Sequence, residues 1–73
     1  MKSSNIEIST DFIKLDSLLK FAGEASDGVS AKQMILAGEV KVNGEVCTMR
    51  GKKIHEGDTV ELGGEQLTVV NAQ

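Results

Sequence analysis

The spacing of the apolar residues changes near Glu39, from the 3.6-residue period of a helix to the two-residue alternation of a strand. Beyond this point, residues 40–42 and 45–48 alternate on either side of Asn43-Gly44. Asn-Gly between two alternating runs is the strongest short signal for a β-hairpin, because both turn residues must adopt positive φ. The pattern therefore predicts an α+β fold, with helices first and a small, mainly antiparallel sheet after them.

A first helix is predicted after a cap at Thr10 or Asp11. It ends at Gly23, a residue type that suits the left-handed conformation after a helix. Its apolar face is formed by Phe12, Leu15, Leu18, Leu19 and Ala22.

A second helix is predicted from about Gly28 to Ala37, with Ser26 or Asp27 as its cap and Gly38 after its end. Its buried stripe is formed by Ala31, Met34 and Ile35. The short polar turn between the two helices makes them a helical hairpin.

Short strands and turns account for the remaining segments. We expect strands at residues 6–8, 59–62 and 66–70, a charged loop or bulged strand end at 49–53, and turns at 56–58 and 63–64. Residues 1–73 are predicted to form a single domain, because no proline, low-complexity tract or linker-like change in composition divides them.

The cysteine content and hydropathy point to the cytoplasm. Cys47 is the only cysteine, which excludes an internal disulfide and is typical of a reducing compartment. No apolar run near the N-terminus resembles a signal peptide, and none approaches the roughly 18 residues of a membrane span. We therefore expect a soluble cytoplasmic protein that makes no contact with membranes.

The net charge of −3 is unevenly distributed. Residues 32–53 carry five Lys and Arg against two acids, whereas residues 1–31 carry three against five, and residues 54–73 carry four acids and no Lys or Arg. Screening confines a charge's field to about 8 Å at physiological salt. A local basic patch in the central segment can therefore bind phosphate although the whole chain is acidic.

Residues suited to catalysis or metal binding are few. His55 and Cys47 would have to touch to form a nucleophilic pair, and His55, Glu56 and Asp58 are the one group with metal-ligand chemistry. The simpler interpretation makes Cys47 a small strand residue and His55 part of a solvated loop. We expect no enzymatic activity, no metal and no cofactor.

Aromatic residues for base stacking are also scarce, because the chain has no Trp or Tyr and two phenylalanines. We expect Phe12 in the core, whereas Phe21 lies off the main apolar stripe. An RNA ligand would then be recognised by its shape and backbone through Lys and Arg side chains.

The basic residues fit that mode of recognition. Arg50, Lys52 and Lys53 crowd three cations into four positions, and Lys41 alternates with Val40 and Val42, so it projects from the sheet away from the core. Lys14 and Lys32 lie near the starts of the two predicted helices. For each lysine alone, the competing interpretation is a solubilising surface residue.

Three segments together resemble the RNA-binding domain named after small-subunit ribosomal protein S-four. They are Leu15–Lys20, Ala31–Val40 and the V-x-V-N-G run at 40–44, followed by the turn at Gly57-Asp58. The resemblance covers about residues 12–62, where the family has a helical hairpin and β-hairpin called the αL motif. The chain resembles in particular small stand-alone bacterial members of YbcJ type, which share the Gly28–Lys32 helix start and the basic stretch at 50–53.

The resemblance implies that the helical hairpin and the β-hairpin face structured RNA, such as ribosomal or transfer RNA. Carried over by position, the RNA-binding residues are Lys14, Lys32, Lys41, Asn43, Arg50, Lys52 and Lys53. The chain departs from the family where many members have Ser-Arg, because Asp27 and Gly28 stand there. A protein-interaction module without a nucleic-acid ligand is the alternative.

Overall fold

The computed structural model describes residues 2–72, which form a five-stranded sheet, a two-stranded ribbon and two helices. In chain order the elements are β1 (Lys2–Ile8), β2 (Phe12–Lys14), α1 (Leu15–Phe21), α2 (Gly28–Leu36), β3 (Lys41–Val42), β4 (Glu45–Val46), β5 (Lys53–His55), β6 (Thr59–Leu62) and β7 (Glu65–Asn71). The predicted α+β class and the order of its helices and strands are confirmed.

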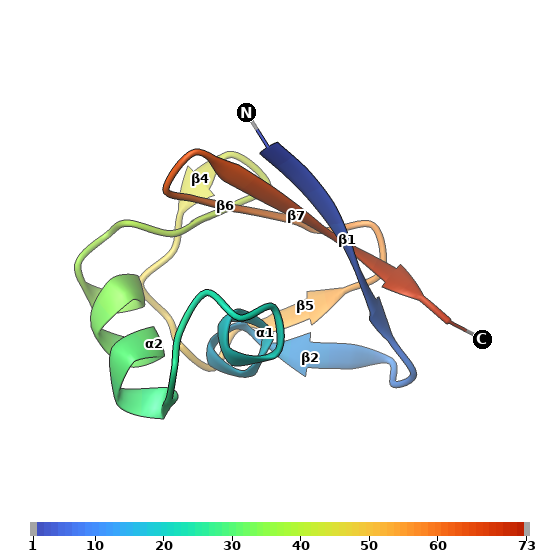
Figure 1. Cartoon of the computed structure of the whole chain (residues 1–73), viewed down its shortest axis with the longest axis horizontal. Helices are drawn as coiled ribbons and strands as arrows, with labels where there is room; N and C mark the ends of the chain where they lie inside the picture. Colours follow the sequence, from blue (N-terminus) through green and yellow to red (C-terminus); the bar gives the residue numbers. More distant parts are fainter. Residues whose placement is uncertain (1, 73) are drawn as a thin grey trace.

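The large sheet has the strand order β1-β7-β6-β3-β4. Its neighbouring strands are antiparallel except β1 and β7, which run parallel with Lys2 beside Glu65 and Ile8 beside Asn71. Strands β2 and β5 form a separate antiparallel ribbon. Figure 1 shows the ribbon and both helices on the same side of the large sheet.

The hydrophobic core lies between the large sheet and the layer of helices and ribbon. Helix α1 contributes Leu15, Leu18 and Leu19, which are fully buried. Each such side chain contributes about 1.5–3 kcal/mol on burial, so packing stabilises a seven-residue helix that would be unstable alone. The other buried residues are Ile8, Ala25, Ala31, Ile35, Val40, Val42, Ile54, Val60, Leu62, Leu67 and Val69.

The first helix begins later than the sequence pattern predicts, because residues 12–14 form strand β2. The predicted caps, Thr10 and Asp11, do not cap the helix: the N-cap residue is Lys14, whose side chain makes no capping hydrogen bond. The hydroxyl of Thr10 donates to the carbonyl of Phe12 at 2.7 Å instead. Pairing with β5, which no local pattern reports, keeps this segment extended.

The second helix agrees with its prediction. Asp27 caps α2, where its carboxylate accepts a hydrogen bond from the Ser30 N–H at 2.8 Å. Ala31 and Ile35 are buried, and Met34 packs partly buried against the core. These contacts turn the predicted stripe of α2 toward the sheet.

The predicted β-hairpin is also confirmed. Asn43 and Gly44 have φ angles of 52° and 87°, as the tight turn between β3 and β4 requires. The ladder is short, because each of the two strands contains only two residues. Cys47, which we expected in a strand, follows the end of β4, and its Sγ lies 3.7 Å from the carbonyl oxygen of Met49.

Two further single-residue predictions were wrong because of the β2–β5 ribbon. His55 lies in strand β5 rather than in a loop, and its cross-strand neighbour is Phe12. Phe12 is partly exposed and is not part of the core. The alternate residues Ile13 and Ile54 face the core in its place.

Candidate nucleic-acid interface

Four cations from two distant segments meet where α1 begins. Strand register sets Lys14 opposite Lys53. The N–H groups of Leu15 and Asp16 donate to the carbonyls of Lys52 and Arg50, at 2.9 and 3.1 Å. These bonds satisfy two of the N–H groups that a helix leaves free at its start, and they hold the 50–53 segment against α1. We call Lys14, Arg50, Lys52 and Lys53 the basic cluster.

The side chains of the basic cluster are exposed and unpaired by carboxylates. None of the four forms an ion pair within the described part of the chain. Like charges directly opposite each other on paired strands destabilise the pairing, as Lys14 and Lys53 do here. The Lys53 ammonium instead lies 5.0 Å from the centre of the Phe12 ring, a cation–π contact. An anionic ligand would relieve this repulsion.

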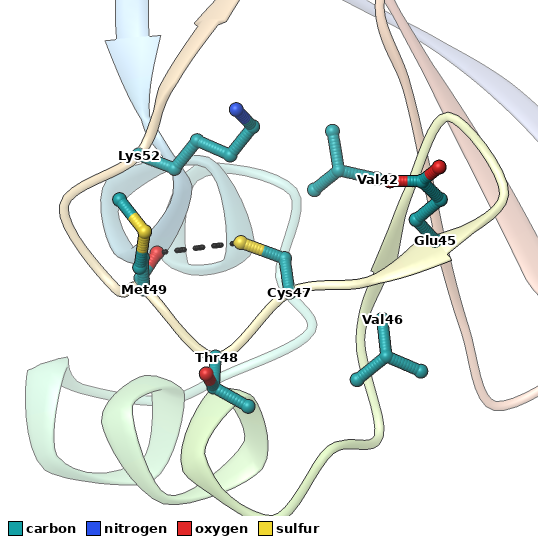
Figure 2. A pocket seen from close by; sticks show the side chains of 7 residues that line it. All are labelled: Val42, Glu45, Val46, Cys47, Thr48, Met49 and Lys52. Carbon is teal, nitrogen blue, oxygen red and sulfur yellow. Dashed lines mark hydrogen bonds between the residues drawn. The ribbon is translucent and has the colours of Figure 1, made fainter.

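A pocket of about 250 Å³ lies between β4 and the loop that carries Arg50 and Lys52. Figure 2 shows Lys52 extending over it from one side and Val46 on the other. Val46 and Met49 are both more than half exposed. The pocket is lined by Val42, Glu45, Val46, Cys47, Thr48, Met49 and Lys52. It adds an apolar border to the cationic surface.

Lys41 lies apart from the basic cluster. Its neighbours in the sequence, Val40 and Val42, are buried on the side of the helices, so Lys41 projects from the opposite face of the sheet, as predicted. There it lies opposite Glu61 of β6, and Glu39 lines the same shallow pocket. We call Glu39, Lys41 and Glu61 the acidic face, because two glutamates flank one lysine there.

The amide of Asn43 makes hydrogen bonds within the protein. Its Oδ1 accepts from the Thr59 N–H at 2.9 Å, and its Nδ2 donates to Asp58 Oδ1 at 3.2 Å. The other Asp58 oxygen accepts from the His55 N–H at 2.8 Å. The His55 N–H bond, followed by the Asn43 bond, lowers the pKa of Asp58. Asn43 thus ties the β3–β4 turn to the β5–β6 turn.

The start of α2 carries both a cation and an acid. Lys32 is exposed on the first turns of the helix, whereas the Asp27 carboxylate caps it. Hydrogen bonds from Ser30 lower the pKa of Asp27, so this residue stays negatively charged. The space around Gly28 is open, with no other heavy atom within 4 Å of the position a Cβ would take. The position where many family members have arginine is therefore open here but lacks its cation.

His55, Glu56 and Asp58, the residues with metal-ligand chemistry, do not form a metal-binding group in the described structure. Over residues 2–72, no three His, Cys, Asp or Glu side chains gather where they could hold a metal ion. Neither helix described here has the length and apolar character needed to cross a membrane.

The combination of a helical hairpin, a β-hairpin and a basic stretch is that of the S-four family, and comparison with known proteins confirms it. The S4 domain model matches residues 6–70, so the chain belongs to the S4 domain family. A probable ribosome maturation protein, RlbA of Bacillus subtilis (strain 168), is 41% identical over 59 residues, which cover 81% of this chain and 83% of RlbA.

A second relative supports the same assignment. The putative RNA-binding protein YbcJ of Escherichia coli (strain K12) is 41% identical over 58 residues, covering 80% of this chain and 83% of YbcJ. The solution structure of Escherichia coli YbcJ superposes with a TM-score of 0.67 at 36% identity, over 96% of this chain and 87% of that one. That structure is described as revealing an αL motif involved in RNA binding.

Sequence reasoning missed the ribbon and its outward residues. Phe12-Ile13-Lys14 and Lys53-Ile54-His55 each alternate around one isoleucine, which is a two-residue period. Over the first segment this period overlaps the helical spacing of Phe12 and Leu15, and three residues are too few to separate the two periods. The alternation of residues 53–55 is the signal that could have indicated a strand there.

Proposed function

We propose that this chain is an RNA-binding module that recognises structured RNA through the basic cluster, together with Lys32 of α2. The observation that carries the proposal is the convergence of four exposed cations without carboxylate partners at the start of α1. The descriptions of YbcJ as a putative RNA-binding protein, and of its αL motif as involved in RNA binding, support it.

The two other predicted contact residues take different roles in this proposal. Asn43 positions the β-hairpin and does not offer its amide to RNA, because that amide already bonds to Asp58 and Thr59. Lys41 contributes little to phosphate binding, because it lies among the carboxylates of the acidic face. This leaves five cations as phosphate contacts.

Ribosomal RNA is the class of target that we propose. RlbA, which shares 41% identity with this chain, is named a probable ribosome maturation protein. The module would act in the cytoplasm by binding rather than by catalysis. A protein partner on the same ribonucleoprotein is compatible with the apolar border formed by Val46 and Met49.

The salt dependence of binding tests the proposal. A cation that neutralises a phosphate releases condensed counterions, so five contacts predict a log–log salt slope of about −4.5 on a duplex-like RNA. We would measure fluorescence anisotropy with a labelled ribosomal RNA hairpin from 50 to 300 mM KCl. The variant with R50A, K52A and K53A combined should bind about a hundredfold more weakly at 0.15 M salt, with a slope closer to −1 or −2.

The controls separate RNA binding from a loss of folding. All three substituted side chains are exposed, so the unfolding temperature of the variant should stay close to that of the native chain. A flat salt response of the native protein, or unchanged affinity of the variant, would contradict the proposal. The first result would redirect the search to a protein partner.

A further inference from the structure

The outward face of the β2–β5 ribbon combines rings and cations. Alternation along two paired strands sets four side chains on this face: Phe12, Lys14, Lys53 and His55. The opposite face is apolar, with Ile54 fully buried and Ile13 packed against the core. The two isoleucines therefore hold the ribbon against the core, and its other face is directed toward solvent.

The two rings lie together at one end of this face. The ring centres of Phe12 and His55 are 6.1 Å apart, and the ring planes are inclined by 49°. The His55 side chain is 58% exposed, so one side of the pair is open to a ligand. Imidazole and phenyl rings are among the side chains on which unpaired nucleobases stack.

The backbone positions of the two lysines lie at the other end, and the Lys53 ammonium reaches from there to 5.0 Å from the centre of the Phe12 ring. Lys14 and Lys53 are directly opposite each other, and neither has a carboxylate partner within residues 2–72. The carboxylate of Asp58 lies at the ring end instead, 3.8 Å from His55 Nδ1. A phosphate would therefore be attracted to the lysine end of the ribbon and repelled from the ring end.

We propose that the outward face of the ribbon binds one unpaired nucleotide, whose base stacks on His55 and Phe12 and whose phosphate lies between Lys14 and Lys53. Two residues along a strand span about 6.6 Å, a distance that one nucleotide can bridge between its base and its phosphate. The Lys53 ammonium, now over the Phe12 ring, moves to the phosphate as the base arrives.

This inference rests on the proposed function and sharpens it. Lys14 and Lys53 also belong to the basic cluster, so the nucleotide site adjoins the surface proposed for the paired part of the RNA. The preferred ligand would then be an RNA hairpin that continues into a single-stranded segment. A fully paired hairpin would leave the two rings unused.

Paired RNA ligands and three variants test the inference. One RNA is a blunt hairpin, and the other is the same hairpin with a four-nucleotide 3′ overhang that contains 2-aminopurine, whose fluorescence falls on stacking. The native protein should bind the overhang RNA about tenfold more tightly and quench the 2-aminopurine. His55→Ala should abolish both effects, and His55→Phe should keep them. Phe21→Ala is the matched control, because Phe21 is 65% exposed and lies at the last residue of α1, the end opposite the one that joins the ribbon.

The outcomes distinguish this inference from the proposed function. Equal affinity for the two RNAs, without quenching, would overturn the nucleotide site and leave RNA binding in place. Loss of the overhang preference in Phe21→Ala, with no loss in His55→Ala, would also overturn it and move the stacking to α1. If neither RNA binds, the proposed function itself fails. The quenching by the native protein does not depend on whether any variant folds.

Discussion

The basic cluster and the acidic face present lysines in opposite electrostatic surroundings. Across the ribbon, Lys53 lies opposite Lys14, so two positively charged residues occupy directly paired positions. Across the large sheet, Lys41 lies opposite Glu61, with Glu39 at the same pocket. The sequence pattern makes these lysines look equivalent, because each lies beside a β-branched apolar residue in a short run. Cross-strand register decides which of them can bind a polyanion.

The same comparison explains how a chain with a net charge of −3 can bind RNA. The acidic face lies on the side of the large sheet that the helices leave uncovered, whereas the basic cluster lies in the layer of helices and ribbon (Figure 1). At physiological salt, fields decay over about 8 Å, so the two surfaces act largely independently. The predictions below separate them.

The largest expected effect comes from removing the anchor of the ribbon. Ile54→Ala leaves a cavity beneath β5 and should lower the free energy of unfolding by about 2–5 kcal/mol. Urea denaturation measures this loss, and Val46→Ala, which truncates an exposed side chain, is the control, with a change within about 0.5 kcal/mol. Equal losses in the two variants would mean that the ribbon is not anchored through Ile54.

The next effect compares a lysine of the basic cluster directly with Lys41. Lys52→Ala removes one of the proposed phosphate contacts and should weaken RNA binding about fivefold at 0.15 M salt. Lys41→Ala should leave the affinity within about twofold, because its charge is already offset by nearby glutamates. Anisotropy titrations of the two variants against one RNA hairpin measure the difference. A larger loss in Lys41→Ala would reverse the proposed interface.

A smaller effect is the pH dependence of stability from Asp58. Its folded-state pKa is lowered, first by the His55 N–H and then by the Asn43 amide, so the ionised group stabilises the fold at pH values above its unfolded pKa of about 3.8. That contribution is lost as pH falls below 3.8 through the folded-state pKa. Thermal unfolding between pH 2 and 6 should show this decline. In Asp58→Asn it should be shallower, and an equal slope would contradict the assignment.

The smallest effect has the opposite sign and comes from Glu24, in the turn between the two helices. A hydrogen bond to Glu65, then burial and repulsion from the same carboxylate, raise its pKa. Its contribution to stability is therefore present below its unfolded pKa of about 4.5 and is lost as pH rises through the folded-state value. Glu24→Gln should raise stability at pH 7 by no more than about 0.5 kcal/mol, measured by urea denaturation. A clear decrease would show that the charge is stabilising.

Local signals predicted most of the fold. The Asn43-Gly44 turn, the Asp27 cap and the α2 stripe each depend on residues within one turn of the chain, and each is found where expected. Strand β6 agrees at both ends with the predicted 59–62 segment. These features are set by backbone preferences and local periodicity, which a single sequence displays directly.

The features that were mispredicted depend on pairing between distant segments. Nothing within residues 9–15 shows that β5 will pair with residues 12–14 and keep them extended, or that carbonyls of residues 50 and 52 will replace a side-chain cap. The position of Phe12 and the surroundings of Lys41 follow from the same kind of register. The predicted list of basic residues therefore contained the basic cluster but could not separate it from Lys41.

The parallel pairing of β1 with β7 has a consequence for the order in which the fold is made. Lys2 pairs with Glu65, and β7 separates β1 from every other strand of the large sheet. During synthesis β1 cannot pair until β7 has left the ribosomal exit tunnel. The β1–β7 pairing closes the longest loop of the chain, and the entropic cost of that closure grows with the logarithm of the loop length. The sheet is therefore completed by its first and last strands together.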